Sequence, residues 1–363
     1  MAGFTYQQVG VDPERKAAGL AGLLRWVSQS FVFRPDLGKP LLPIGAYANA
    51  IRLTPDIAVA ITTDNVGTKV LVAQLAGRYD TVGFDCVAIN VNDLLCVGAT
   101  PLALVDYIAV AQIEAETLEQ IGRGLYEGAR QARIAIVGGE LAQVRELLQG
   151  VRPETAFDLS ATAIGVVHPE RLIVGADLAP GDVVLGLPSS GLHCNGLTLA
   201  RRILLSEAPY QVDTVVPELG QTVGEALLSP TRIYVAEALA LLDANIAVKA
   251  FFHISGDGWL NLLRYQAEGV GLRIEQVPEP PALFRLIQEL GPVSPAEMYR
   301  TFNMGVGFAI IVPEARAEQA HDLIEAQGTP VWHLGRVVAD SERRLVLAPL
   351  GLVGRKGSFE RER

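Results

Sequence analysis

Four acidic residues in the first half of the chain follow or interrupt apolar segments, where an unpartnered carboxylate is costly. Asp64 ends the run AITTD, Asp106 follows PLALV, Glu140 follows AIVGG, and Asp93 lies inside CVAINVNDLLCVG. Carboxylates that meet in one place repel one another unless protons or metal ions neutralise them. Mg²⁺ suits such a set, because it takes oxygen ligands and commonly bridges carboxylates to substrate phosphates. If the strands that carry them are neighbours, these side chains form a site for Mg²⁺ and a nucleotide.

The stretch TTDNVGTK, residues 62–69, contains residue types that handle phosphate: Gly67 for close backbone approach, a hydroxyl at Thr68 and a cation at Lys69. A P-loop needs four residues between its glycines and then Gly-Lys-Ser/Thr, an order that is absent here. The stretch is therefore either an ordinary turn with a solvated acid and lysine, or part of a different phosphate-binding architecture.

A second candidate phosphate loop lies in DVVLGLPSSGLHCNGLTLARRILL, which has the pattern of a strand, a polar loop and a helix. Ser189, Ser190, His193 and Asn195 supply side-chain donors, and the loop leads into a helix N-terminus, where free N–H groups favour an anion. The alternative is a capped helix with a polar loop, in which His193 is only a hydrogen-bonded loop residue.

The elements that must position these residues follow from hydrophobic periodicity. We predict strands over residues 57–62, 103–109, 134–137, 159–167 and 183–187, and helices over 118–132 and 197–205. The segment 86–98 is also a predicted helix, with Asn90 and Asp93 on one face. Because that face is otherwise apolar, these two need a cation, donors or water in a polar cavity, or an internal hydrogen-bonded network. In EMYRTFNMGVGFAII, Arg300, Thr301 and Asn303 precede either a ligand-facing turn or a hairpin connection.

Composition bounds the classes of function. A chain of 363 residues suggests two domains, and 50% hydrophobic with 19% charged residues is typical of a globular protein. The net charge of −10 argues against a nucleic-acid partner. Three cysteines without CxxC spacing fit a reducing compartment. With no targeting pattern at the N-terminus and no apolar run long enough for a membrane span, we expect a cytoplasmic protein with no membrane partner. No G-x-G-x-x-G follows a predicted strand, which excludes a nicotinamide dehydrogenase.

Taken together, the motifs point to one family. TTDNVGTK, GFDCVAINVNDLLCVGATPLALVDY, IVGGE, SSGLHCNG, SPTRIYV and EMYRTFNMGVGF follow one another in the order and spacing of the aminoimidazole ribonucleotide synthetase family, the phosphoribosylformylglycinamidine cyclo-ligases. The chain resembles this family from about residue 5 to 345.

The resemblance implies an α+β, two-domain PurM-like fold, in which the N-terminal domains of a homodimer pair into a β-barrel. We expect an ATP/metal-binding and dimerisation domain over 1–170, a C-terminal domain over 171–345, and a tail over 346–363 whose polar, basic end KGSFERER is frayed. The implied reaction belongs to de novo purine biosynthesis. ATP phosphorylates the formyl oxygen of formylglycinamidine ribonucleotide, and the imidazole ring of aminoimidazole ribonucleotide then closes, which releases ADP and phosphate. The implied cofactors are ATP and Mg²⁺, with allowance for a monovalent cation.

The motifs and the resemblance together give the predicted site. Catalytic roles fall to Asp64, Lys69, Asp93 and His193. ATP or phosphate contacts fall to Asn65, Gly67, Thr68, Asp106, Gly138, Gly139, Ser190, Gly191 and Asn195. Metal ligation falls to Asp64, Asp93 and Glu140, and a phosphate contact to Lys69.

The chain departs from the family pattern in the predicted ligand loops. Asn65 replaces a glycine, Gln143 stands where the family has a second acid, and Asp257 adds a carboxylate to a glycine loop, where it would repel phosphate unless a cation lies beside it. Residues 41–53 are also short of glycines. Two alternatives remain open for this reason. One is a paralogue that uses Mg²⁺-ATP on a different small-molecule acceptor, and the other is a catalytically weak nucleotide-binding protein.

Overall fold

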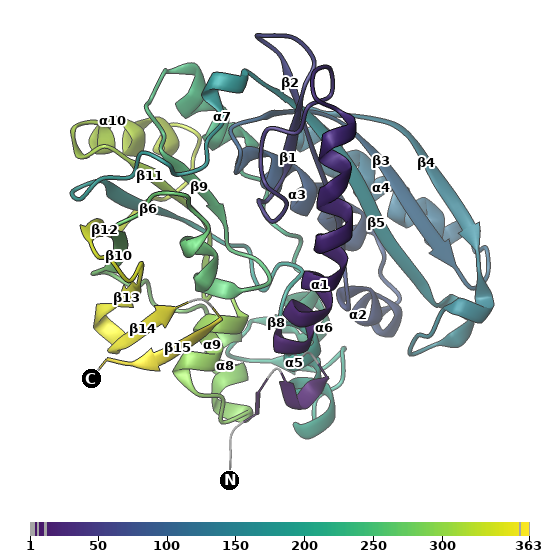
Figure 1. Cartoon of the computed structure of the whole chain (residues 1–363). Coiled ribbons are helices and arrows are strands. Elements are labelled where there is room, and N and C mark those ends of the chain that lie inside the picture. Colours follow the sequence, from purple (N-terminus) through teal and green to yellow (C-terminus); the bar gives the residue numbers. More distant parts are fainter. Residues whose placement is uncertain (1–3, 6, 11–12, 356, 363) are drawn as a thin grey trace.

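The computed structural model describes residues 4–5, 7–10, 13–355 and 357–362. Figure 1 shows two sheets, one in each half of the chain, with helices packed around them. The first sheet has five strands in the order β1-β2-β5-β3-β4. Their bounds are β1 (Asn49–Arg52), β2 (Ala58–Asn65), β3 (Thr100–Val110), β4 (Ala135–Gln143) and β5 (Phe157–Val167). All pairs are antiparallel except the parallel pair of β3 and β4.

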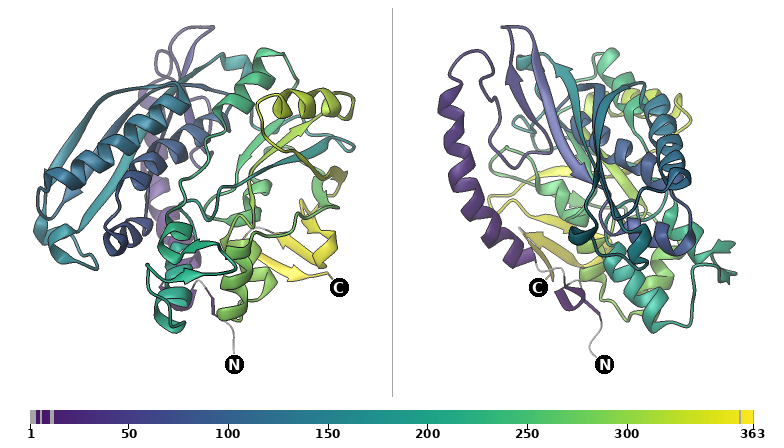
Figure 2. Two further views of the ribbon diagram at one scale, coloured as in Figure 1. Left: turned by 180° about the vertical axis from the view of Figure 1, so that it is seen from behind. Right: turned by 90° about the vertical axis from the view of Figure 1, so that its right-hand side faces the viewer.

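The two faces of this sheet differ. Along β5, side chains alternate between buried, such as Ala161 and Ala163, and partly exposed, such as Ile164. The buried side packs against α3 (Asp80–Leu95), and α4 (Ala115–Ala132) lies on α3, as the view from behind in Figure 2 shows. A further helix, α2 (Lys69–Ala76), follows β2 directly. The strands and helices predicted for this half are confirmed, because strong alternation and 3.6-residue periodicity mark them.

The opposite face of the first sheet is open. By register, Val105 and Tyr107 of β3 and Ile164 of β5 share it, and their side chains are 41%, 42% and 37% exposed. Helix α1 (Pro13–Val27) lies on this side of the molecule (Figure 2) and exposes Leu20 and Trp26. The open face and α1 are thus apolar surfaces that no described segment buries.

The second sheet has eight strands in the order β15-β14-β13-β10-β12-β6-β11-β9. Their bounds are β6 (Val183–Pro188), β9 (Ala250–His253), β10 (Val270–Ile274), β11 (Val306–Val312), β12 (Trp332–Ala339), β13 (Leu345–Leu347), β14 (Leu352–Arg355) and β15 (Ser358–Arg361). A separate hairpin pairs β7 (Val215–Val216) with β8 (Gln221–Thr222). The helices of this half are α5 (Leu197–Arg202), α6 (Val223–Leu228), α7 (Val235–Asp243), α8 (Ala282–Leu290), α9 (Pro295–Thr301) and α10 (Glu314–Glu325).

Short helical turns complete the described chain. They are η1 (Gln7–Val9), η2 (Ser28–Phe33), η3 (Arg145–Leu147), η4 (Pro153–Thr155), η5 (Pro169–Arg171), η6 (Ile203–Glu207), η7 (Gly258–Leu263) and η8 (Ala348–Leu350). The π-helical turn η6 extends α5, so the predicted helix over 197–205 is present but changes its winding after Arg202. Across the described residues, no helix is long and apolar enough to cross a membrane.

Two sequence-based expectations in this half are wrong. The end KGSFERER is not frayed over its described residues, because β15 (Ser358–Arg361) pairs with β14 at the edge of the second sheet and buries Phe359. The segment with Arg300 and Thr301 is not a hairpin connection either, since both residues end α9 before β11 begins. Both elements are too short for hydrophobic periodicity to reveal them.

Candidate functional site

Two of the predicted acids lie in one row across the first sheet. Asp64 on β2 and Asp106 on β3 are both paired with Ala161 on β5, and Gly139 on β4 continues the row. Directly paired residues point to the same face. The small side chain of Ala161 therefore separates two carboxylates whose Cα atoms are about 10 Å apart, as twice the usual interstrand spacing. The predicted convergence is met for Asp64 and Asp106.

Asp106 is the more buried member of this row. A Cβ on Gly139 would lie 2.5 Å from Asp106 Oδ1, so glycine is required there for the carboxylate to fit. Burial raises the pKa of Asp106 above its usual value. Among the described residues, no cation pairs with it. A half-buried carboxylate without a cation is the environment in which a metal ion is an effective partner.

Glu140 does not join this row. It is paired with Tyr107, whose side chain lies on the open face, whereas Asp106 faces α3. The expectation that Glu140 meets Asp64 is wrong within one copy of the chain, since neighbouring positions of a strand alternate between faces. No cluster of three or more acidic, histidine or cysteine side chains suited to a metal occurs in the part of the chain that the structure describes.

Asp93 is held by the second half of the chain. Its Oδ1 lies 2.9 Å from Nδ1 of His253 at the end of β9, and the imidazole is 2% exposed. The backbone N–H of His253 also donates to Cys96 Sγ at 3.2 Å. Asp93 therefore has the internal partner that its place on an apolar helix requires, and the pair brings a carboxylate to the junction of α3 and β9.

Lys69 is not available to a phosphate in this structure. Its side chain is fully buried, its Nζ lies 2.7 Å from Asp85 Oδ2, and it donates to the Ser229 carbonyl at 2.6 Å. The phosphate contact predicted for Lys69 stays a prediction, and in this structure the ammonium has these two protein partners. The lysine instead joins α2 and α3 to the segment SPTRIYV, residues 229–235, of the second half.

His193 is likewise buried in this structure. It is 1% exposed and adopts a positive φ of 60°, and Nε2 accepts the backbone N–H of Ser190 at 3.3 Å. Burial, reinforced by the nearby His253 and Lys69, lowers the pKa of His193 well below its usual value, so the imidazole is neutral. In this structure the buried neutral ring holds its own loop, and the catalytic role predicted for His193 stays a prediction.

The two predicted phosphate loops do lie side by side. The hydroxyls of Thr68 and Thr198 are 3.0 Å apart, and a Cβ on Gly67 would contact the carbonyl of Cys194 at 3.9 Å. Gly67 has a φ of +67°, which explains the glycine, whereas Asn65 is extended within β2.

The loop over 189–196 is shaped by its own partners. Asn303 accepts the Ser189 hydroxyl at 2.9 Å and donates to the Gly191 carbonyl at 2.8 Å. The Ser190 hydroxyl donates to the Pro230 carbonyl. Asn195 lies beside the glycine loop, with its Oδ1 3.3 Å from the position of a Cβ on Gly256. Gly138 on β4 is paired with Val105 on β3.

Helix α3 carries functional residues that sequence reasoning missed. Asp85 Oδ1 accepts both the backbone N–H of Thr231 at 2.7 Å and its hydroxyl at 2.6 Å. Asn92 donates to the Arg232 carbonyl at 2.8 Å and accepts the Tyr234 N–H at 3.1 Å. The signal was present, since Asp85 and Asn92 also interrupt an apolar helix. What the signal lacks is the partner, which lies about 140 residues away along the chain.

Comparison with known protein families divides the chain into the same two halves as the two sheets. The family model described as the AIR synthase related protein N-terminal domain matches residues 45–167, and the model of the corresponding C-terminal domain matches residues 179–348. This chain belongs to the AIR synthase related family. The matched ranges contain both sheets of the family fold up to β13, and the unmatched residues 168–178 contain the link between them.

Relatives with established names extend the family match to nearly the whole chain. A phosphoribosylformylglycinamidine cyclo-ligase of Thermococcus kodakarensis is 46% identical over 337 residues, which cover 93% of this chain and 96% of that protein. The protein of the same name from Methanothermobacter thermautotrophicus is 42% identical over 90% of this chain and 93% of its own.

Solved structures share the fold at lower identity. The thiamine-monophosphate kinase of Stenotrophomonas maltophilia has a TM-score of 0.59 at 20% identity, over 88% of this chain and 94% of that one. HypE, a hydrogenase maturation protein of E. coli, has a TM-score of 0.57 at 20% identity, over 84% of each chain. At this identity the likeness concerns the PurM-like fold alone.

Within this family frame, the unusual loop residues are accommodated. Asp257 Oδ2 accepts a hydrogen bond from Arg264 at 2.6 Å, so the cation that the extra carboxylate needs is present. The Arg264 guanidinium also lies over the Tyr47 ring at 5.0 Å. Gln143 is the exposed last residue of β4, away from the row of Asp64 and Asp106.

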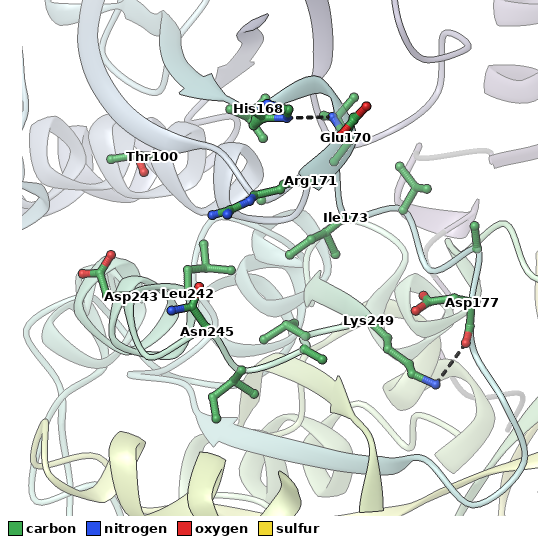
Figure 3. Close-up of a pocket in the computed structure, with 18 of the residues that line it drawn as sticks. Thr100, His168, Glu170, Arg171, Ile173, Asp177, Leu242, Asp243, Asn245 and Lys249 are labelled. Atoms are coloured by element: carbon green, nitrogen blue, oxygen red, sulfur yellow. Dashed lines mark hydrogen bonds between the residues drawn. The ribbon is translucent and has the colours of Figure 1, made fainter. Parts of the chain in front are cut away.

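A cavity of about 730 Å³ lies away from all of these residues (Figure 3). It is lined by the link over 167–174 and by the connection from α7 to β9. Lys249 beside it is already bonded to Asp182 at 2.8 Å and to the Asp177 carbonyl at 3.0 Å. This cavity follows from the junction between the halves and holds none of the predicted site residues.

Proposed function

We propose that the protein catalyses the ATP-dependent ring closure of formylglycinamidine ribonucleotide to aminoimidazole ribonucleotide. The observation that carries this proposal is the 46% identity to a cyclo-ligase over 93% of this chain. The solved likenesses do not discriminate among activities, because they share only the fold. The accommodated loop residues Asn65, Gln143 and Asp257 also remove the main reason for expecting a different acceptor.

ATP and Mg²⁺ belong to this proposal, and the residues present fit them. Asp64 and Asp106 would hold the ion, because they share one face and Asp106 is half buried without a cationic partner among the described residues. Bound there, Mg²⁺ supplies charge neutralisation for the nucleotide phosphates. The adjoining Gly67 and Gly139 let the backbone and the carboxylate come close to the phosphates.

The chain's own residues would act chiefly by positioning, as phosphoryl transfer requires. Asp93 and His253 hold each other at the junction of α3 and β9, and Arg264 lies near with its charge partly used by Asp257. This arrangement fixes a carboxylate and a ring between the two halves, where a substrate that spans them would be oriented. No nucleophilic side chain is needed, since the attacking nitrogen belongs to the substrate.

The same proposal includes a homodimer, a boundary between two domains near residue 170, and a cytoplasmic location. A second copy would cover the open face that exposes Val105, Tyr107 and Ile164, as an apolar patch of this kind favours. It would also bring Glu140, which shares that face, to the interface. Cys86, Cys96 and Cys194 are free thiols, as a reducing compartment allows.

One assay tests the activity. Purified protein is incubated with Mg²⁺-ATP and formylglycinamidine ribonucleotide, and both ADP and the aminoimidazole product are followed. Formation of both in equal amounts supports the proposal. ADP without imidazole in the presence of another acceptor would indicate a paralogue, and ATP binding without turnover would indicate a nucleotide-binding protein.

We expect Asp93→Asn to lower turnover at least about tenfold while the protein stays folded, because the pair with His253 loses its charge. An unchanged rate would remove Asp93 from the site.

A further inference from the structure

A second cavity, of about 520 Å³, lies where the N-terminal segment meets α2 and α5. Its lining comes from segments far apart in sequence: Phe4, Gln8, Leu75, Val151, Thr198, Arg201, Arg202, Leu205 and Ser206. The lining thus combines apolar side chains with one amide, two hydroxyls and two guanidinium groups. None of the described residues that line it is acidic.

Arg201 is the unusual member of this lining. Its Nε is buried and has no hydrogen-bond partner, and no described carboxylate pairs with its guanidinium. Burial lowers the pKa of Arg201, because the fold places this cation in a partly desolvated position. An arginine remains charged in proteins, so an anion bound in the cavity would stabilise it.

The next residue provides a comparison. Arg202 lines the same cavity from the same helix, but its guanidinium lies 2.6 Å from Glu207 and its side chain is 53% exposed. An exposed pair of this kind needs no further partner. The two arginines are adjacent and chemically identical, and only Arg201 lacks an anion.

The position of Arg201 connects it to the candidate site. Thr198 is three residues earlier on α5, so the two side chains share a face of the helix. The Thr198 hydroxyl lies 3.0 Å from that of Thr68, which directly follows Gly67. Arg201 therefore lies about one helical turn from the contact between the two predicted phosphate loops.

We infer that Arg201 and Thr198 form a subsite for a phosphate ester, and that it takes the 5′-phosphate of the ribonucleotide substrate. This step rests on the proposed function. A planar guanidinium binds two phosphate oxygens at once, and a hydroxyl can donate to the third. The ATP phosphates are the other source of the same chemistry, but a Mg²⁺-bound polyphosphate needs carboxylates nearby. These are found at Asp64 and Asp106 and not among the described residues of this lining.

The test compares Arg201→Gln with Arg202→Gln as its matched control. For Arg201→Gln we expect the KM for formylglycinamidine ribonucleotide to rise at least about tenfold, which corresponds to about 1.4 kcal/mol. The KM for ATP should stay within about twofold, and Arg202→Gln should leave both within about twofold. Arg201→Lys, which keeps the charge but not the fork, should recover part of the loss.

Combining the Arg201 variant with a substrate that lacks its 5′-phosphate tests whether these two groups are in contact. Removing the 5′-phosphate should lower the kcat/KM of the parent protein at least about tenfold, but should lower the kcat/KM of Arg201→Gln only slightly further. A rise in the KM for ATP instead of that for the ribonucleotide would assign Arg201 to ATP and overturn the inference. Equal effects of Arg201→Gln and Arg202→Gln would overturn it too.

A binding measurement separates this inference from the proposed reaction. Ribose 5-phosphate is titrated into the parent protein, Arg201→Gln and Arg201→Lys by calorimetry, and thermal unfolding checks that each variant is folded. Binding that Arg201→Gln abolishes and Arg201→Lys partly retains supports the phosphate subsite even if no imidazole product is ever formed. Binding of ribose 5-phosphate that is equal in all three proteins, or absent from the parent, excludes the subsite whatever the enzyme's reaction.

Discussion

Lys69 shows how one residue can join the two halves of the chain. Its fully buried ammonium lies 2.7 Å from the equally buried Asp85 carboxylate, which in turn accepts Thr231 of the second half. We expect Lys69→Met to lower the free energy of unfolding by about 3–5 kcal/mol, because a buried carboxylate loses its counter-charge. Urea unfolding at neutral pH measures the change.

The exposed pair of Arg78 and Asp80 is the control. These side chains are 49% and 41% exposed, so Arg78→Met should cost less than about 1 kcal/mol. If Lys69→Met costs no more than Arg78→Met, the buried pair does not hold the halves together, and Lys69 regains its place as a candidate phosphate ligand.

His193 predicts a dependence of stability on pH. Burial holds its pKa well below the usual value in the folded state, whereas the unfolded chain binds a proton near pH 6.5. The unfolded state therefore takes up one more proton as pH falls below about 6.5, and stability is lost in that range by up to about 1.4 kcal/mol per pH unit. Above that pH the imidazole is neutral in both states and contributes no slope.

The variant His193→Gln isolates this contribution. Its free energy of unfolding should fall less between pH 6.5 and pH 5 than that of the parent protein, by about one proton's worth of slope. His168→Gln is the comparison, since that histidine is partly exposed at the link, where its ring accepts the Glu170 N–H and its Nε2 lies 3.6 Å from Asp56 Oδ1. Identical slopes for the parent and His193→Gln would contradict the assignment of a neutral buried ring.

From the residue types, the kind of chemistry was easier to propose than the contacts that each side chain makes. The sequence brought Asp64 and Asp106 together only on the condition that their strands lie near each other, and in the sheet β5 stands between β2 and β3. Glu140 was misplaced because a register shift between Leu104 and Val105 sets which face each β4 residue takes, and no sequence pattern reveals it. Lys69 and His193 looked reactive because burial, which decides their roles, depends on residues far away in the sequence.

At the scale of elements, the crossing of α3 and α4 depends on glycines. A Cβ on Gly124 would lie 1.8 Å from the carbonyl of Asp80, and one on Gly83 would lie 2.2 Å from that of Ile121. The helix backbones are thus closer than any side chain permits. We expect Gly124→Ala to destabilise the protein by at least about 2 kcal/mol, because the helices must separate.

Gly122 lies on the same helix and gives the opposite expectation. Nothing lies within 4 Å of a Cβ placed there. Gly122→Ala should therefore stabilise the protein by about 0.5–1 kcal/mol through the higher helix propensity of alanine. Denaturant midpoints of the two variants decide the matter, and a Gly124→Ala protein as stable as Gly122→Ala would mean that the helices are not in close contact.

Helix α3 also shows the limit of prediction at this scale. Its pattern predicted a helix whose Asn90 and Asp93 need polar partners, and both have them. The identity of the partners could not be predicted, because residues 229–235 and His253 reach α3 only after the second half has folded against the first. Short strands such as β14 and β15 were missed for a related reason: they gain stability from a sheet edge rather than from their own alternation.

For the whole molecule, the order of the motifs in the sequence was sufficient to predict the family and its PurM-like fold, since the motifs are distributed over both ranges that the family models match. The open face of the first sheet was not predictable from alternation alone. Partly polar outer positions, such as Ser160 and Thr162, read as a solvated face, while Val105, Tyr107 and Ile164 beside them remain apolar.

The open face of the first sheet leads to a prediction about assembly: formation of the proposed homodimer should depend on this face. Val105→Lys places a charge among the exposed apolar residues without touching the face packed on α3. If two copies bury this face against each other, the variant raises the dimer dissociation constant at least about 100-fold, which corresponds to about 2.7 kcal/mol. Sedimentation equilibrium over a concentration series measures it. Val215→Lys, on the separate β7–β8 hairpin and 66% exposed, should leave assembly unchanged. A dimer equally stable in both variants would place the contact elsewhere, and a parent protein that is monomeric at every concentration would leave the open face without its proposed partner.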